Sequence, residues 1–133
     1  MNRIARNIDG ERVDILNATR EERYYCELCG GELIPKQGTV NQWHYAHRTV
    51  GDCDSWHEMT PWHSDWQEEF YEEYREVVVE SDGEKHRADV KMANKVIEFQ
   101  SDYLSPGTFF RRMDFYSKDN MFVWVFDVRD KDI

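Results

Sequence analysis

The spacing of the cysteines constrains this chain more than any other feature of its sequence. Two residues separate Cys26 from Cys29, and Cys53 follows after a segment that contains His44 and His47. An odd number of cysteines that includes a C-x-x-C pair favours metal binding over disulfide formation in a reducing compartment. A tetrahedral Zn²⁺ takes four ligands, so these five residues compete for four places.

The spacing leaves two ligand sets open. The first uses every thiol and consists of Cys26, Cys29, His47 and Cys53, whereas the second has His44 in place of Cys53. Either set supplies four protein ligands and leaves no open position for water, so we expect a structural zinc. The segment between the outer cysteines is rich in Gly, His and Trp and lacks periodicity. We therefore expect a loop-built module that is held by metal rather than by a core.

The composition predicts a folded, cytoplasmic protein. A hydrophobic fraction of 40% with 14% aromatic residues supplies enough bulky side chains for a core in a chain of 133 residues. No segment reaches the roughly 20 apolar residues of a membrane span, and the first residues lack the apolar middle of a signal peptide. We therefore expect no membrane partner.

The negative charge is concentrated in one segment. The net charge is −10, and the excess of acidic residues lies in residues 49–83, where Arg75 is the sole basic residue. The segments on either side are balanced in charge. A charge run of this kind is usually a solvated face, and here it also suits a protein partner.

Local patterns divide the chain into a hairpin and zinc-binding module in residues 1–57 and a second part in residues 58–133. The second part begins with a helix after Thr60, a residue type that suits an N-cap. An aromatic stripe along this helix is predicted to face the core: Trp62, Trp66, Phe70 and Tyr74. Three strands, a second helix and a last strand follow, at about residues 77–80, 86–92, 96–100, 105–118 and 121–128. The patterns thus predict an α+β protein whose second part has the order α-β-β-β-α-β.

Two acids are predicted to face each other across a hairpin in the second part. If its turn centres on Ala93 and Asn94, Asp89 lies opposite Glu98. Alternation then places both acids on one sheet face and the apolar residues on the other, so one face is core and the other chemical. Opposed like charges are destabilising, and Mg²⁺ or Mn²⁺ would compensate them and polarise a phosphodiester. The alternative is that both acids merely pair with Arg87 and Lys91 on a wet sheet face.

Several strings of residues occur in a particular order in the second part. They are Trp62-His63-x-x-Trp66-Gln67, His86-Arg87-Ala88-Asp89-Val90, Val96-Ile97-Glu98-Phe99-Gln100, Ser105 and Arg112-x-x-Phe115-Tyr116. Together they resemble the CoiA-like competence protein family, whose nuclease-like domain is similar to the PD-(D/E)XK superfamily, over about residues 24–127. The resemblance implies a PD-(D/E)XK nuclease-like α-β-β-β-α-β core with a small N-terminal zinc-ribbon-like module.

The resemblance also implies roles for individual residues. Asp89 and Glu98 match the metal-binding acids, and the Phe99 carbonyl would be a further ligand of Mg²⁺ or Mn²⁺. Gln100 stands where the superfamily usually has a catalytic lysine, and its neutral amide can orient water and donate hydrogen bonds but cannot supply a charge. His63 is a candidate base or phosphate-positioning residue, with a buried structural histidine as the alternative.

The same resemblance favours one of the two zinc sets. The family has a Cys-Cys-His-Cys arrangement, which corresponds to Cys26, Cys29, His47 and Cys53 in this chain. The alternative set with His44 departs from that arrangement.

These observations predict a small metal-dependent DNA endonuclease that hydrolyses phosphodiester bonds and carries a separate structural zinc. The alternative is a catalytically inactive, zinc-containing regulator on the same fold that binds nucleic acid or protein, in competence, defence or phage biology. Its acidic segment, residues 49–83, would then contact the protein partner. A chain with so little beyond the core is also compatible with a homodimer that reaches both DNA strands.

Overall fold

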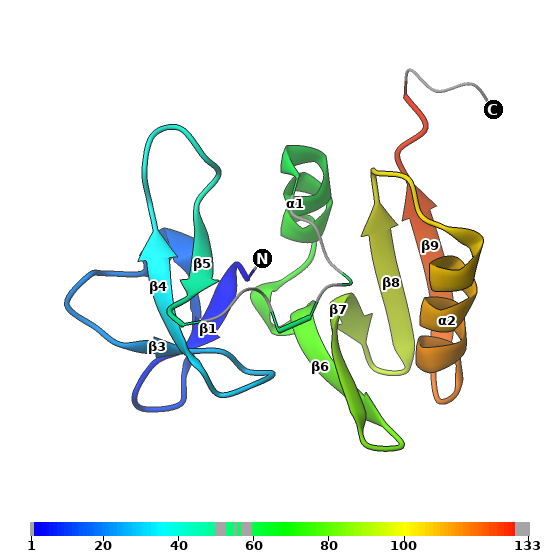
Figure 1. Ribbon diagram of the computed structural model, residues 1–133, viewed down its shortest axis with the longest axis horizontal. Helices are drawn as coiled ribbons and strands as arrows, with labels where there is room; N and C mark the ends of the chain where they lie inside the picture. Colours follow the sequence, from blue (N-terminus) through cyan, green and yellow to red (C-terminus); the bar gives the residue numbers. More distant parts are fainter. Residues whose placement is uncertain (1, 50–52, 55, 57–59, 130–133) are drawn as a thin grey trace. The chain divides into compact units, whose positions relative to one another are not determined.

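The computed structural model describes residues 2–49, 53–54, 56 and 60–129 (Figure 1). The chain divides into two compact units, Met1–Met59 and Thr60–Ile133. The boundary predicted between residues 57 and 58 lies outside the described residues, as do several residues of the acidic segment. The described residues form two sheets and two α-helices, which confirms the α+β class.

The first unit is built on a five-stranded antiparallel sheet in the order β2-β1-β3-β4-β5 (Figure 1). Its elements are β1 (Ile4–Arg6), β2 (Arg12–Asp14), the 3-10 helix η1 (Ile15–Asn17), β3 (Tyr24–Tyr25), β4 (Glu32–Lys36) and β5 (His44–His47). A bridge between Asn2 and Tyr45 links β5 to the chain just before β1, so the sheet curls back on itself.

A hydrophobic core fills the first unit. Its buried residues come from β1, η1, β3, β4, β5 and the C-x-x-C turn: Ala5, Ile15, Tyr24, Cys26, Leu33 and Tyr45. The prediction of a loop-built module without a core was therefore wrong. β4 and β5 were missed because a two-residue period is hard to detect over four or five residues, and because Pro35 interrupts the β4 pattern.

The second unit is a four-stranded sheet in the order β6-β7-β8-β9 with two helices. Its elements are α1 (Pro61–Glu68), the 3-10 helix η2 (Glu72–Tyr74), β6 (Arg75–Ser81), β7 (Glu84–Met92), β8 (Lys95–Gln100), α2 (Pro106–Ser117) and β9 (Met121–Phe126). The first three strands are antiparallel neighbours, and β9 returns through α2 to lie parallel to β8. The element order is the predicted one.

Both helices begin at a hydroxyl cap that is followed by a proline. The Thr60 hydroxyl accepts the NH of His63 at 3.2 Å, and the Ser105 hydroxyl accepts the NH of Thr108 at 3.3 Å. These caps satisfy main-chain donors that have no partner inside the helix, so the start of each helix is fixed locally. Neither helix within the described residues is long and apolar enough to cross a membrane.

The inward face of α1 differs from the prediction. The helix ends at Glu68, and its buried residues are His63, Ser64 and Gln67 rather than the aromatic stripe. Trp66 is 42% exposed and stacks on Phe99 with the ring centroids 5.6 Å apart. The predicted orientation of the stripe is confirmed only in part: Trp62, Trp66 and Phe70 contact the buried Phe99, but polar residues of α1 occupy its buried positions.

The Leu33→Ala substitution is expected to lower the free energy of unfolding of the first unit by about 2–5 kcal/mol, because a buried leucine leaves a cavity. Leu33 is 3% exposed, whereas Leu16 is 59% exposed. Leu16→Ala makes the same chemical change and is expected to stay within about 0.5 kcal/mol of the parent. Urea unfolding followed by circular dichroism measures both variants, and equal losses would contradict this core.

Candidate functional site

Three thiols and one imidazole lie together in the first unit. The ligand atoms of Cys26, Cys29, His47 and Cys53 all lie within 4.8 Å of one another. Sulfur and imidazole nitrogen in a group of four are the ligands that tetrahedral zinc prefers. This cluster can therefore hold a metal such as zinc, and the four residues are those of the first predicted set.

The turn at the first two cysteines arranges main-chain NH groups around their sulfurs. The NH of Leu28 lies 3.4 Å from the Cys26 sulfur, and the NH of Gly31 lies 3.3 Å from the Cys29 sulfur. Gly30 adopts a φ of +73°, a conformation that glycine reaches without strain, and its NH closes the turn onto the Cys26 carbonyl at 2.9 Å. NH groups that point at sulfur favour the thiolate, which is the form that binds metal.

Only one of the two histidines on β5 belongs to the cluster, because their side chains lie on opposite faces of the sheet. His44 and His47 are three residues apart on a strand, so alternation sends their side chains to opposite sheet faces. His47 pairs with Leu33 and Tyr45 pairs with Pro35, so His47 shares the core-facing side with Tyr45. The Nδ1 atom of His44 instead lies 2.8 Å from the main-chain carbonyl of Gln42.

The Cys53 thiol resists ionisation in the absence of a cation. The Cys26 and Cys53 sulfurs are 3.7 Å apart. Partial burial raises the pKa of the Cys53 thiol well above its usual range, and the neighbouring Cys26 and Cys29 raise it further. The residue as a whole is exposed, so the effect belongs to the sulfur, which is turned into the cluster. A bound divalent cation would reverse this repulsion, because metal ligation deprotonates thiols.

Asp89 and Glu98 meet at one end of the β7–β8 hairpin. Regular pairing runs from the turn to Val90 opposite Ile97, which is the predicted register. One position further, the NH of Asp89 donates to Glu98 Oε2 at 2.7 Å, and the NH of Phe99 donates to Asp89 Oδ2 at 2.8 Å. Each carboxylate thus accepts a main-chain NH of the opposite strand. Both carboxylates are buried, at 3% and 0% exposure.

A buried arginine on α2 compensates Glu98. Arg112 Nη2 lies 3.2 Å from Glu98 Oε1, and Nη1 donates to Gln100 Oε1 at 3.3 Å. The guanidinium carbon also lies 4.8 Å from the centroid of the Trp124 ring. Gln100 Nε2 donates to the Asp102 carbonyl at 3.0 Å, so protein groups bind both ends of this amide.

A buried histidine on α1 compensates Asp89. His63 Nε2 lies 2.9 Å from Asp89 Oδ2, and both side chains are nearly inaccessible to solvent. Among the described residues, His63 Nδ1 has no hydrogen-bond partner. Gln67, one turn further along the helix, donates to the Asp89 main-chain carbonyl at 2.9 Å. The two acids are therefore side by side but take their partners from different helices.

The sheet face predicted to be chemical is buried rather than open. Arg87 and Val96 are 3% and 0% exposed, and the Tyr116 hydroxyl on α2 donates to the Arg87 carbonyl at 3.1 Å. Arg87 pairs with the buried Glu76 at 3.2 Å. The wet face of the alternative is therefore not found, because α2 packs over this face, and Glu98 pairs with Arg112 rather than with Arg87 or Lys91.

Sequence reasoning assigned no role to three residues of this network: Gln67, Glu76 and Trp124. Gln67 belongs to one of the strings that carry the family resemblance, and this membership could have indicated a role for it. Glu76 has a φ of +50°, which no sequence pattern indicates for a glutamate at the start of a strand.

Comparison with known proteins bears on the first unit. Residues 8–55 match the model of the N-terminal domain of competence protein CoiA. Residues 8–55 are therefore similar to a CoiA N-terminal domain. This match contains all four residues of the Cys/His cluster and confirms the resemblance to the CoiA-like family. Asp89 and Glu98 lie outside the matched residues. No curated protein and no solved structure matches the chain.

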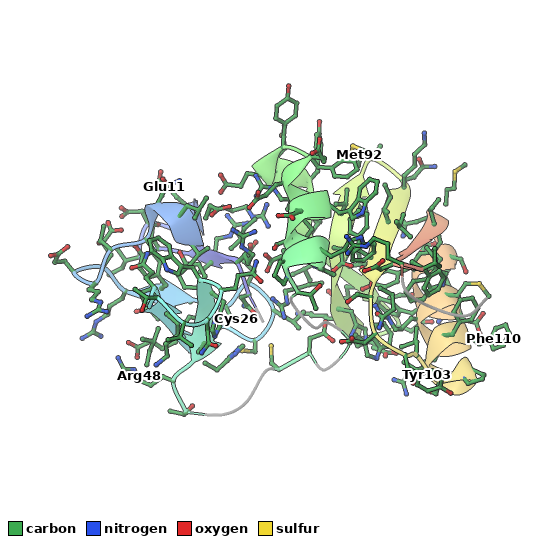
Figure 2. The ribbon with its side chains drawn as sticks, turned by 90° about the horizontal axis from the view of Figure 1, so that it is seen from above. Glu11, Cys26, Arg48, Met92, Tyr103 and Phe110 are labelled. Atoms are coloured by element: carbon green, nitrogen blue, oxygen red, sulfur yellow. The ribbon has the colours of Figure 1, made fainter. Side chains whose placement is uncertain are left out.

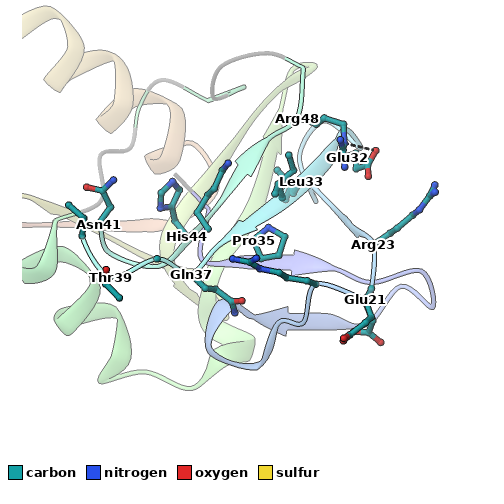
Figure 3. Close-up of a pocket in the computed structure, with 16 residues that line it drawn as sticks. Glu21, Arg23, Glu32, Leu33, Pro35, Gln37, Thr39, Asn41, His44 and Arg48 are labelled. Atoms are coloured by element: carbon teal, nitrogen blue, oxygen red, sulfur yellow. Dashed lines mark ion pairs between the residues drawn. The ribbon is translucent and has the colours of Figure 1, made fainter.

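The CoiA-like N-terminal unit also has a broad hollow along β4 and the loops beside it. It measures about 980 Å³, and charged side chains of both signs line it, including Arg23, Glu32 and Arg48 (Figure 3). Arg48 pairs with Glu32 at 3.2 Å. His44 lines this hollow, whereas the four cluster residues do not, so the two histidines belong to different surfaces of the CoiA-like unit.

The His47→Ala substitution is expected to remove most of the zinc bound by the chain, because three ligands remain at the cluster. His44→Ala is the matched control and is expected to keep about one equivalent, since His44 lies outside the cluster. Mass spectrometry of the metal in freshly purified protein measures both. Zinc loss in the His44 variant alone would contradict this ligand set.

The Arg112→Ala substitution is expected to cost about 3–5 kcal/mol of unfolding free energy, because it leaves the Glu98 carboxylate buried without its guanidinium. Its neighbour Arg111 pairs with Glu84 at the surface, where its side chain is 65% exposed. Arg111→Ala is expected to cost less than about 1 kcal/mol. Urea titrations of both variants test the difference, and similar midpoints would argue against the buried network.

Proposed function

We propose that the second unit is a PD-(D/E)XK-like nuclease core and that the chain hydrolyses phosphodiester bonds of DNA with Mg²⁺ or Mn²⁺. One observation carries the proposal: two carboxylates, Asp89 and Glu98, meet where β7 and β8 cease regular pairing. The α-β-β-β-α-β order and the parallel β8–β9 pair support it.

The donor set has the oxygen chemistry that Mg²⁺ and Mn²⁺ prefer. Asp89 and Glu98 would hold the ion together with the Phe99 carbonyl. When bound, the ion would polarise the phosphodiester and lower the pKa of the attacking water. At present Arg112 and His63 supply positive charge or hydrogen bonds to these carboxylates, so binding a cation requires at least one of these contacts to lengthen.

Two further residues of the chain have roles in this proposal. His63 holds the Asp89 carboxylate through Nε2, which leaves its other ring nitrogen to exchange a proton or position a phosphate. Gln100 lies beside the acids and would orient water by hydrogen bonding after one of its two present contacts is exchanged. A neutral amide lacks the charge of the usual lysine, so charge stabilisation would fall to the cation.

We propose that zinc occupies the Cys/His cluster and has a structural role. Four protein ligands leave no position for a reacting water, so the cluster would brace the first unit rather than take part in hydrolysis. The chemistry and the zinc therefore belong to different units.

A second function is favoured by the burial of the acids. Glu98 has no exposed surface and pairs with Arg112, and a carboxylate compensated in this way has less need of a metal. The alternative is a catalytically inactive regulator that binds nucleic acid or protein, with the acidic segment of residues 49–83 as the contact for a basic partner. A homodimer is compatible with either function, and so is a place in competence, defence or phage biology.

The Asp89→Asn substitution is expected to lower the rate of DNA cleavage in Mn²⁺ by about two orders of magnitude or more, because it removes a charged ligand. Asp114→Asn changes an exposed aspartate of α2 and is expected to keep the parent rate. Linear, branched and single-stranded DNA and the corresponding RNA are incubated with each protein, and products are resolved on denaturing gels. If the parent and the Asp89 variant give the same products, the enzyme proposal is wrong and the binding function remains.

A further inference from the structure

An aromatic hollow lies next to Gln100 in the second unit. It measures about 540 Å³ and is formed by the loop after β8, the first turns of α2 and the end of β9. Four of its lining residues are aromatic: Tyr103, Phe109, Phe110 and Phe126. Tyr103 and Phe110 are labelled near the first turns of α2 in Figure 2.

Two rings of this hollow are exposed, and other rings beside them are stacked. Tyr103 is 85% exposed and Phe110 is 56% exposed, which is unusual for large apolar side chains. Phe110 contacts Phe109 edge-on at 5.2 Å. Phe109 stacks on Trp124 at 5.4 Å with an interplanar angle of 15°, and Trp124 stacks on Phe126 at 5.4 Å with an angle of 22°. A stack that is already ordered loses little entropy when a further flat ring joins it.

The hollow is continuous with the network around the paired acids. Gln100 lines it and accepts a hydrogen bond from Arg112, which also pairs with Glu98. The Trp124 ring, which carries the stack, packs against the same arginine. A group bound in the hollow would therefore lie beside the proposed site of hydrolysis.

The Asp102 carboxylate favours a base over a phosphate in the hollow. Asp102 and Asp127 both line it, but Asp127 pairs with Arg129 at 2.9 Å, so the repulsion of phosphate falls to Asp102. Carboxylates accept hydrogen bonds from amino groups, as acidic side chains do when they read cytosine. Aromatic rings stack on every base, because each base has a π face.

We propose that this hollow binds an unpaired nucleobase and that the nucleic acid recognised is single-stranded or has an unpaired end. In a duplex both faces of a base are covered by neighbours, so a base reaches the hollow only after it leaves the stack. The inference rests on the proposed action on nucleic acid, and it names the form of that substrate.

The test measures binding with the zinc-loaded Asp89→Asn chain, without added Mg²⁺ or Mn²⁺, so that turnover does not interfere. Fluorescence anisotropy at one fixed salt concentration compares a labelled single-stranded oligonucleotide with a blunt duplex of the same sequence. The single strand is expected to bind at least about tenfold more tightly, in line with the stacking of even one base.

Variants of the exposed rings assign the binding to the hollow. Phe110→Ala and Tyr103→Ala are each expected to weaken single-strand binding by about tenfold, with little effect on the duplex. Tyr71→Ala is the matched control, since Tyr71 is 78% exposed and does not line the hollow. This control is expected to bind as the parent does.

Two results would overturn the proposal. The first is equal affinity for single strand and duplex, or unchanged binding in both ring variants. The second is a molar mass by light scattering of twice the chain mass that Phe110→Ala returns to the monomer value, since the rings would then contact a second copy. A failed cleavage assay together with strand-selective binding would remove the nuclease proposal and leave this one intact.

Discussion

Two buried carboxylates and the main-chain NH groups that they accept organise the second unit. Asp89 and Glu98 each bond to the opposite strand, which keeps the hairpin closed where regular pairing ends. An ionised carboxylate in a buried position is costly unless hydrogen bonds and opposite charge compensate it. His63 on α1 and Arg112 on α2 supply that compensation. Each acid therefore ties one helix to the sheet.

In the proposed function, the same network decides between hydrolysis and binding alone. A divalent cation would have to compete with the guanidinium of Arg112 for the Glu98 carboxylate. The Cys/His cluster stands apart from this competition, because it belongs to the other unit and offers four ligands of its own. The proposed structural zinc and the proposed chemistry at the paired acids would thus be separable, because they belong to different units.

Much of the second unit was predictable because its signals are local. The hydroxyl and proline before each helix fixed where the helices begin, and the turn at Ala93 and Asn94 fixed the register that brings Asp89 beside Glu98. The inward face of α1 was not predictable from its aromatic period. Its polar residues turn inward because they find partners on β7, and those partners are distant in sequence. In the first unit, strands of four or five residues are too short for their two-residue period to be recognised in the sequence.

The sequence by itself determined the spacing of the thiols, the helix starts and the opposition of two acids across a hairpin, since each follows from residues close together along the chain. Only the tertiary structure decided that His47 rather than His44 joins the cysteines, because strand alternation turns one toward the core and the other away. It also decided that Arg112 covers the acids. That contact exists because α2 packs on the face that alternation alone would have left open to water.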